Sequence, residues 1–184
     1  MVSNSDFLKI GITIDGIIAG EGELINNLLE TGVIDIMHIR KPTWEYEELK
    51  KLLLSINSSY YSKIKLHDHF ELINEMGLRG AHLNFRNPYA KGVDGKLSCS
   101  LHSLTELAKI SATGEINRME YVTLSPIYDS ISKKGYKAAF NLREISKEIK
   151  DRPVIALGGI TPENFEELRV TGFKGAALSG ALYR

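Results

Sequence analysis

The feature that most constrains the fold of this chain is a repeated alternation of short apolar runs with longer segments of helical periodicity. The runs number eight and recur about every 24 residues, which suits strand–helix units joined by short loops. Alternating strands and helices form a parallel sheet, so we expect an α/β protein. The expected strands are Leu8–Ile14, Ile34–Ile39, Ile64–Leu66, Gly80–Leu83, Leu97–Leu101, Tyr121–Leu124, Val154–Leu157 and Gly175–Ser179.

The segments between the runs carry signals for helix starts and ends. Residues 43–56 repeat leucine and isoleucine at helical spacing. Ser103 and Glu106 have the spacing of a capping box, and Thr161 precedes a proline at the first helical position. A further helix starts at Asn141. Glycines stand where helix ends need a left-handed residue, at Gly32, Gly77 and Gly172.

Eight such units close into a (β/α)8 TIM barrel, whereas about six would favour an open doubly wound sheet, and we favour the barrel. The chain of 184 residues is shorter than the usual barrel, which has at least about 200. Only five residues follow Ser179, so we expect the eighth helix to be missing or truncated and the fourth and fifth units to be short. Nothing resembling a linker divides the chain, which predicts a single domain over 1–184.

The charge balance narrows the range of partners. Lysine plus arginine and aspartate plus glutamate each number 23, so the net charge is zero. Binding to nucleic acid or to an anionic membrane needs a basic excess, so we expect small-molecule substrates instead. The single cysteine, Cys99, excludes an intrachain disulfide. The start has no signal-peptide pattern and no segment reaches about 18 apolar residues, which predicts a cytoplasmic protein. A homo-oligomer is possible.

Histidines concentrate at the ends of the expected strands, where a barrel places its functional face. Two of them, His67 and His69, flank Asp68. On an extended strand they would point to one side, with Asp68 on the other. A zinc site there would need a third histidine, and because no zinc spacing motif is complete we do not favour zinc. Asp68 itself suits magnesium, which prefers carboxylate and phosphate oxygens. The five histidines are His38, His67, His69, His82 and His102.

Two small-residue turns predict a phosphate ligand. Gly158 and Gly159 follow an apolar strand and precede a helix start, and Ser179 follows the next strand. Backbone amides at such turns bind anions, and barrels often build phosphate sites from the loops after strands seven and eight. We therefore expect the amides of Gly159 and Ser179 to hold a phosphate. A polar loop after the sixth strand carries Ser130, Ser132 and Lys133, whose hydroxyls and ammonium suit a diphosphate.

Several of these segments resemble the thiamine-phosphate synthase family, which includes the thiazole tautomerases. The resembling segments are Val154-Ile-Ala-Leu-Gly-Gly-Ile160, Ser100-Leu-His-Ser103, Tyr121-Val-Thr-Leu-Ser-Pro-Ile-Tyr128 with Lys133-Lys134-Gly135, and His38-Ile-Arg40. The resemblance implies a (β/α)8 barrel and a role in thiamine biosynthesis. The implied reaction is transfer of hydroxymethylpyrimidine from its diphosphate to thiazole phosphate, with release of diphosphate.

The resemblance also implies roles for individual residues. Arg40 and Lys133 match diphosphate-binding positions, with Ser130 and Ser132 beside the lysine. Asp68 matches a magnesium ligand, which makes Mg2+ the expected cofactor. The remaining implied substrate contacts are His38, His67, Ser100, Gly158, Gly159, Leu178 and Ser179.

Three departures from the family pattern leave alternatives open. Asn87 stands where a second magnesium carboxylate is expected, His67 replaces an asparagine, and Pro42 replaces a lysine for which Lys41 is a candidate substitute. One alternative is a tautomerase in which His102 is the acid and base and no metal is needed. Another is a non-catalytic binder of thiazole or thiamine phosphate. Because both Asp68 and Lys133 are retained, we favour the synthase.

Overall fold

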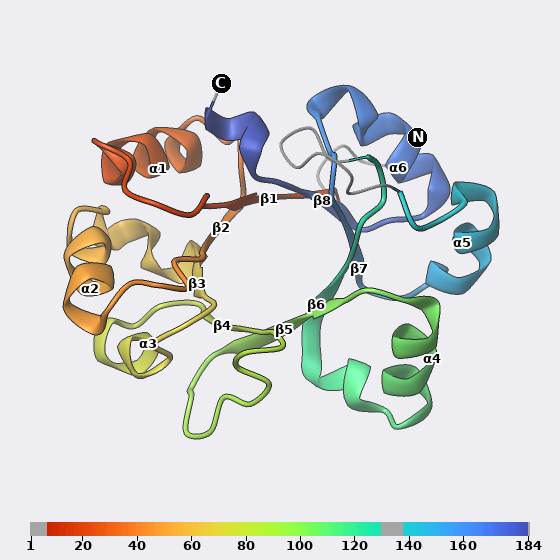
Figure 1. The fold of residues 1–184 in the computed structure, drawn as a ribbon, viewed down its shortest axis with the longest axis horizontal. Coiled ribbons are helices and arrows are strands. Elements are labelled where there is room, and N and C mark those ends of the chain that lie inside the picture. Colours follow the sequence, from red (N-terminus) through yellow and green to blue (C-terminus); the bar gives the residue numbers. More distant parts are fainter. Residues whose placement is uncertain (1–6, 130–137, 184) are drawn as a thin grey trace. The chain divides into compact units, whose positions relative to one another are not determined.

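Eight parallel strands form a closed barrel whose order follows the chain (Figure 1). The computed structural model describes residues 7–129 and 138–183. The barrel confirms the (β/α)8 fold expected from the sequence. The strands are β1 Leu8–Ile12, β2 Ile36–Ile39, β3 Ile64–Leu66, β4 Gly80–Leu83, β5 Lys96–Leu101, β6 Met119–Leu124, β7 Val154–Leu157 and β8 Gly175–Leu178.

The helices are short, and the fourth and eighth of the eight strand–helix units lack an α-helix in the described residues. The fifth unit, which we expected to be short, has a helix of nine residues, Leu104–Ala112. Residues 84–95 join β4 to β5 without a helix, which confirms the prediction that the fourth unit is short. After β8 the described chain continues as a 3-10 turn, Gly180–Tyr183, where we expected a missing or truncated helix. The α-helices of the described residues are α1 Glu21–Glu30, α2 Tyr46–Leu54, α3 Glu71–Met76, α4 Leu104–Ala112, α5 Leu142–Ile149 and α6 Phe165–Thr171.

Side chains at the helix starts explain where the helices begin. The Ser103 hydroxyl accepts a hydrogen bond from the Glu106 amide at 3.1 Å, as its spacing predicted. Helix α2 begins later than expected, at Tyr46, because Glu45 and Glu48 form the capping box and Glu48 accepts the Glu45 amide at 2.8 Å. None of the helices in the described ranges is long and apolar enough to cross a membrane.

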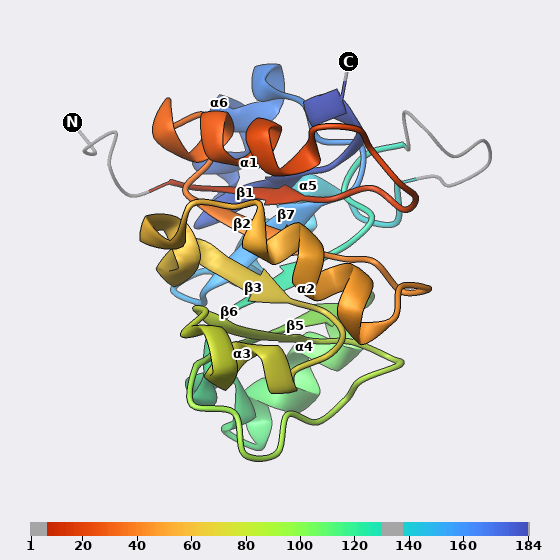
Figure 2. The same cartoon turned by 90° about the vertical axis from the view of Figure 1, so that its left-hand side faces the viewer.

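The chain divides into two compact halves, and the half of residues 10–97 contains α1, α2 and α3. These helices lie along the outer side of β2 and β3 in Figure 2. Strands β2, β3 and β4 are parallel neighbours, with His38 opposite Lys65 and Leu66 opposite Ala81. Successive residues of a strand point to opposite faces, so His38 lies on the other face from Met37, which is fully buried.

The other half, residues 1–9 and 98–184, has its own apolar core. Strand β6 contributes Val122 and Leu124 to this core, and β7 contributes Val154 and Ala156. Leucines and isoleucines of α4, α5 and α6 pack against them, including Leu107, Ile145 and Leu168. Each fully buried leucine or isoleucine stabilises the fold by about 1.5–3 kcal/mol. Alternation along β6 leaves Thr123 on the opposite face of the strand, where its side chain is also buried.

Candidate active site

Three of the five histidines form a buried cluster in the half of residues 10–97, which we call the histidine cluster: His38, His67 and His82. His38 Nδ1 lies 3.0 Å from His67 Nε2, so the two rings share a hydrogen bond. The rings of His67 and His82 stack with centroids 4.4 Å apart. The three side chains meet because His38 lies next to the last residue of β2, while His67 and His82 continue the register that pairs Leu66 of β3 with Ala81 of β4.

Burial keeps the histidine cluster uncharged. It lowers the pKa of His38 and His67 well below the ordinary value, and it lowers the pKa of His82 to about 3. Nearby cations act in the same direction: Lys65 lowers the pKa of each ring in the cluster. Neutral imidazoles at neutral pH are hydrogen-bond donors and acceptors, so the cluster is a neutral polar surface.

Neutral imidazoles are also metal ligands, and the ligand atoms of the histidine cluster all lie within 4.8 Å of one another. The charges around the cluster oppose such use. Arg40 and Arg86 both lower the pKa of His67 through their charge, as does Lys65. The same repulsion acts on a divalent cation. The surroundings therefore favour a neutral or anionic ligand over a metal ion.

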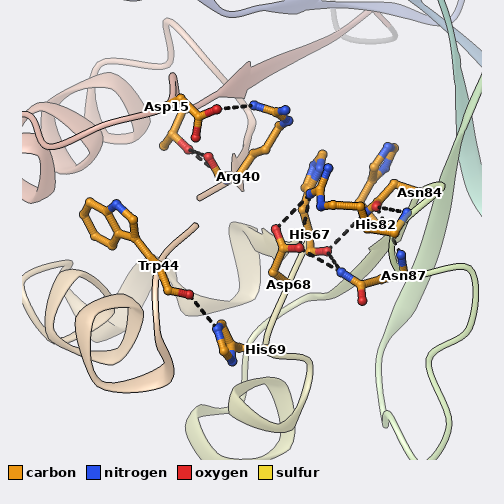
Figure 3. Close-up of polar contacts among 11 residues, drawn as sticks. Asp15, Arg40, Trp44, His67, Asp68, His69, His82, Asn84 and Asn87 are labelled. Carbon is orange, nitrogen blue, oxygen red and sulfur yellow. Dashed lines mark hydrogen bonds and ion pairs between the residues drawn. The ribbon is translucent and has the colours of Figure 1, made fainter. Parts of the chain in front are cut away.

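His69 does not belong to the histidine cluster. The sequence placed His67 and His69 on one side of an extended strand, and this prediction is wrong because β3 ends at Leu66 and His69 has φ 52°. One ring nitrogen of His69 lies 2.8 Å from the Trp44 carbonyl oxygen (Figure 3). The other ring nitrogen lies 3.2 Å from Glu71. His69 therefore ties the segment after β3 to the start of α2 and α3.

Asp68 follows β3, and its carboxylate is bound from two sides. Arg86 Nη2 lies 3.1 Å from Asp68 Oδ1 and 3.2 Å from Oδ2. Asn87 Nδ2 donates to Oδ1 at 2.8 Å and to the His67 carbonyl oxygen at 2.9 Å (Figure 3). Asp68 and Asn87, the two expected magnesium ligands, are therefore neighbours. Asn87 presents its amide nitrogen to the carboxylate.

The chemistry of these donors decides how they could hold Mg2+. A carboxylate and an amide oxygen are hard ligands of the kind that magnesium prefers. The single negative charge of Asp68 is balanced by Arg86, however, so the pair attracts a divalent cation weakly. The residues fit magnesium when a diphosphate brings the further oxygens and negative charge.

Asn84 builds the loop that carries Arg86 and Asn87. Its Oδ1 accepts the backbone amides of Arg86 at 3.0 Å and Asn87 at 3.2 Å. Its Nδ2 donates to the carbonyl oxygens of His67 at 3.0 Å and His82 at 3.2 Å. The sequence placed Asn84 and Arg86 among the polar residues that follow the fourth expected strand, at the functional face, without a specific role for either. The signal was the asparagine itself, which favours such a turn two and three residues ahead of it.

Arg40 directly follows β2 and is held by Thr13, which directly follows β1. Its backbone amide donates to the Thr13 hydroxyl at 2.8 Å, and that hydroxyl donates to the Arg40 carbonyl oxygen at 3.2 Å. Its guanidinium lies 3.5 Å from Asp15, and 34% of the Arg40 side chain is exposed (Figure 3). Arg40 is thus fixed by its backbone while its charge stays accessible to an anionic ligand.

Lys41 does not replace the lysine that is missing at Pro42. Its ammonium is fully buried, 2.7 Å from Glu21, and it donates to the carbonyl oxygens of Ile14 at 2.9 Å and Gly16 at 2.7 Å. With these partners Lys41 is a structural residue of the segment between β1 and α1. The proposal that it substitutes for a ligand-binding lysine is wrong.

His102 follows β5 in the other half of the chain, two residues after Ser100. Its Nδ1 lies 3.1 Å from the hydroxyl of Ser125, and its backbone amide donates to Glu106 at 2.6 Å. Glu106 therefore caps the backbone before α4, and Ser125 orients the ring. This leaves Nε2 as the nitrogen of His102 for proton transfer or substrate contact.

The glycine turn after β7 has a packing reason of its own. Gly158 and Gly159 both have left-handed backbone, with φ 96° and 65°. A Cβ atom on Gly159 would lie 2.3 Å from the Asp129 carbonyl oxygen, so only glycine fits there. Leu178 ends β8, and the Ser179 carbonyl oxygen accepts the Leu182 amide at 2.9 Å. Ser130, Ser132 and Lys133 lie outside the described residues.

A closed (β/α)8 barrel with ionisable side chains at its strand ends defines the class of this protein, the TIM-barrel enzymes. A family model described as thiamine monophosphate synthase matches residues 12–182. The chain therefore belongs to the thiamine monophosphate synthase family, and the resemblance seen in the sequence is confirmed. Its relatives named as thiamine-phosphate synthases indicate a transferase.

Named relatives agree with this assignment. The chain is similar to a thiamine-phosphate synthase of Leptospira biflexa, with 25% identity over 171 residues that cover 87% of this chain and 81% of the relative. A solved structure of thiamine phosphate pyrophosphorylase from Bacteroides thetaiotaomicron is 35% identical, with a TM-score of 0.79, and covers 96% of this chain and 85% of its own. The pyrophosphorylase from Pyrococcus furiosus, at 19% identity and a TM-score of 0.72 over 96% of this chain and 87% of its own, shares the fold.

Proposed function

We propose that this protein is a thiamine-phosphate synthase, which joins hydroxymethylpyrimidine diphosphate to thiazole phosphate and releases diphosphate. The observation that carries the proposal is the family match over residues 12–182, which spans both halves of the chain. For the same reason we propose that the chain acts as a single catalytic domain. Its proposed place of action is the cytoplasm, on small molecules alone.

The chemical step that the residues must support is loss of diphosphate from the pyrimidine. The bond between the methylene carbon and the diphosphate oxygen breaks, its electron pair leaves with the diphosphate, and the thiazole nitrogen then donates its lone pair to the carbon. Negative charge therefore grows on the leaving group. Cations placed in advance at that group lower the barrier by several kcal/mol in a site that excludes water. Arg40 and Lys133 are the residues we propose for this role, with Ser130 and Ser132 as hydroxyl donors.

Magnesium is the cofactor we propose for the diphosphate. Asp68 would hold it, with the Asn87 side-chain oxygen as a second ligand. When bound, the ion supplies positive charge to the leaving group. The ion pair between Asp68 and Arg86 supports binding of magnesium together with diphosphate rather than to the free protein.

The remaining site residues are proposed for the organic parts of the substrates. His38 and His67 belong to the neutral histidine cluster, which suits hydrogen bonds to an uncharged pyrimidine. Gly158, Gly159, Leu178 and Ser179 are proposed to hold the thiazole phosphate through backbone amides. Ser100 and His102 are proposed to contact the reacting groups.

A direct assay tests the function. Purified protein is given hydroxymethylpyrimidine diphosphate and thiazole phosphate, with magnesium or with chelator, and thiamine phosphate and diphosphate are measured. We expect equal amounts of both products with magnesium. The tautomerase alternative is tested in the same samples, by following isomerisation of the thiazole carboxylate substrate. Isomerisation without thiamine phosphate formation contradicts our proposal, and binding of the phosphates without either reaction indicates a non-catalytic binder.

A further inference from the structure

We propose that Arg86 is a diphosphate-binding residue, which takes over part of the charge compensation that a metal ion provides at Asp68. The inference rests on the proposed function, since it concerns the leaving group of that reaction. It assigns a substrate contact to a residue outside the diphosphate-binding set that the family resemblance supplies.

The contact between Arg86 and Asp68 leaves donors for an anion. Asp68 is bound through Nη2, one of the three guanidinium nitrogens, and 40% of the Arg86 side chain is exposed against 13% for Asp68. A guanidinium has five N–H donors arranged in a planar fork, which matches phosphate oxygens. The guanidinium can therefore keep Asp68 as a partner while it binds a phosphate group.

The charges at this position support the same conclusion. Two carboxylates and one Mg2+ would sum to zero before a substrate binds. Here one carboxylate, Asp68, and one guanidinium, Arg86, also sum to zero, and Asn87 is neutral. The loss of a carboxylate at Asn87 thus coincides with a fixed positive charge on the remaining one.

The position of Arg86 is built by the loop rather than by the ion pair alone. Asn84 accepts the Arg86 amide at 3.0 Å and is itself anchored to the strand ends through His67 and His82. Exposed ion pairs are usually worth little because two long side chains must be ordered. Here the Asp68 carboxylate is already held by Asn87 Nδ2 at 2.8 Å, so the Arg86 side chain is the one that remains to be ordered.

The test is calorimetric titration with inorganic diphosphate in the presence of chelator, so that no divalent ion takes part. We expect the wild-type protein to bind, and Arg86→Ala to bind at least about tenfold more weakly, which is the scale of one charge-assisted contact. Arg86→Lys should fall between them, because lysine keeps the charge but lacks the fork. Arg118→Ala is the matched control: it removes one arginine from the 3-10 turn Glu115–Arg118 and should bind as the wild type does.

A second measurement distinguishes the effect of Arg86 from the effect of a metal ion. Binding of Mn2+ to the free protein, followed by electron paramagnetic resonance, should be weak in the wild type. It should increase at least tenfold when Arg86→Gln and Asn87→Asp are combined, because this restores two carboxylates without the guanidinium.

The proposal is overturned if Arg86→Ala binds diphosphate as tightly as the wild type, or if wild-type binding disappears with chelator and returns with magnesium. Circular dichroism and thermal unfolding confirm that each variant is folded. Diphosphate binding needs no turnover, so a protein that binds through Arg86 but forms no thiamine phosphate contradicts the proposed function and leaves this inference standing.

Discussion

Lys41 and Glu21 form a buried ion pair, with Nζ and Oε2 2.7 Å apart and side-chain exposures of 0% and 2%. The pair joins the end of β2 to the first turn of α1. Lys41 also holds the carbonyl oxygens of Ile14 and Gly16, so two carbonyl groups of the segment after β1 and the Glu21 carboxylate depend on one ammonium. Asp15, the partner of Arg40, lies within this segment.

Removing one member of this pair should be costly. We expect Lys41→Met to lower the free energy of unfolding by about 3–5 kcal/mol, because it leaves the Glu21 carboxylate buried without its counter-ion. Urea denaturation followed by circular dichroism measures the change. The pair between Lys50 and Glu75 is the matched control: it is as short, 2.6 Å, but exposed, so Lys50→Met should cost no more than about 1 kcal/mol. Equal losses in the two variants would contradict this reading of Lys41.

Lys133 should carry catalytic charge compensation. We expect Lys133→Ala to lower kcat by about 100-fold or more, the scale of losing one preorganised donor to developing charge. Steady-state release of diphosphate, with both substrates saturating, gives the value. Lys147→Ala removes a lysine from α5 and should leave kcat unchanged. Full activity of Lys133→Ala would refute the proposed mechanism.

Gly159 should tolerate no side chain. A Cβ atom there meets the Asp129 carbonyl oxygen at 2.3 Å, and its φ of 65° is strained for any L-residue. Gly32 has a similar φ of 68° but no heavy atom within 4 Å of the added carbon. We therefore expect Gly32→Ala to cost about 1–2 kcal/mol of stability from backbone strain alone, and Gly159→Ala to cost more. Denaturant midpoints test the order, and equal midpoints would remove the steric argument.

The histidine cluster predicts how stability depends on pH. Its rings have a lowered pKa in the folded state, with His82 at about 3, so between pH 6.5 and 3 the unfolded chain binds more protons than the folded one. Stability contributed by the neutral rings is complete above pH 6.5 and decreases as the pH falls, by up to about 1.4 kcal/mol per pH unit for each ring. We expect His82→Gln to flatten this slope in urea denaturation between pH 7 and 4.5.

The contribution of His69 to stability depends on pH in the opposite direction. Partial burial opposes its charge, but hydrogen bonds to Trp44 and Glu71 prevail and raise its pKa. Its contribution is therefore complete below pH 6.5 and is lost as the pH rises through the raised value. We expect His69→Gln to lower stability more at pH 5.5 than at pH 8. The same loss at both values would contradict this assignment.

The sequence predicted the barrel well because each strand is a short apolar run and each helix start has a local signal. Ser103 caps α4 and Asn141 accepts the Arg143 amide before α5, as their side chains allow. Boundaries differed where neighbouring segments decide them. The first strand ends at Ile12, because Thr13 turns its hydroxyl to the backbone of Arg40 in the next strand.

The site was harder to predict, since its contacts join residues far apart in the chain. Spacing placed His67 with His69, but the left-handed backbone at His69 turns it away, and the partner of His67 is His38, on another strand. In the sequence, Lys41 is a lysine beside Arg40 and therefore resembles a ligand-binding residue. Its buried ion pair with Glu21 shows that its role is structural. The role of Arg86 depends on its contact with Asp68, 18 residues earlier in the chain, which the sequence does not show.

The way Asn84 holds its loop has a consequence for how such a site can change during evolution. It binds the backbone amides of residues 86 and 87 and the ends of two strands, and none of these contacts uses the side chains of residues 86 and 87. Asn87 adds one side-chain contact of its own to the backbone, from Nδ2 to the His67 carbonyl oxygen, so position 86 is the one that can exchange side chains while the contacts of the loop stay in place. A lineage could move between dependence on a metal ion and dependence on an arginine by substitutions at residues 86 and 87, with Asn84 holding the backbone amides throughout.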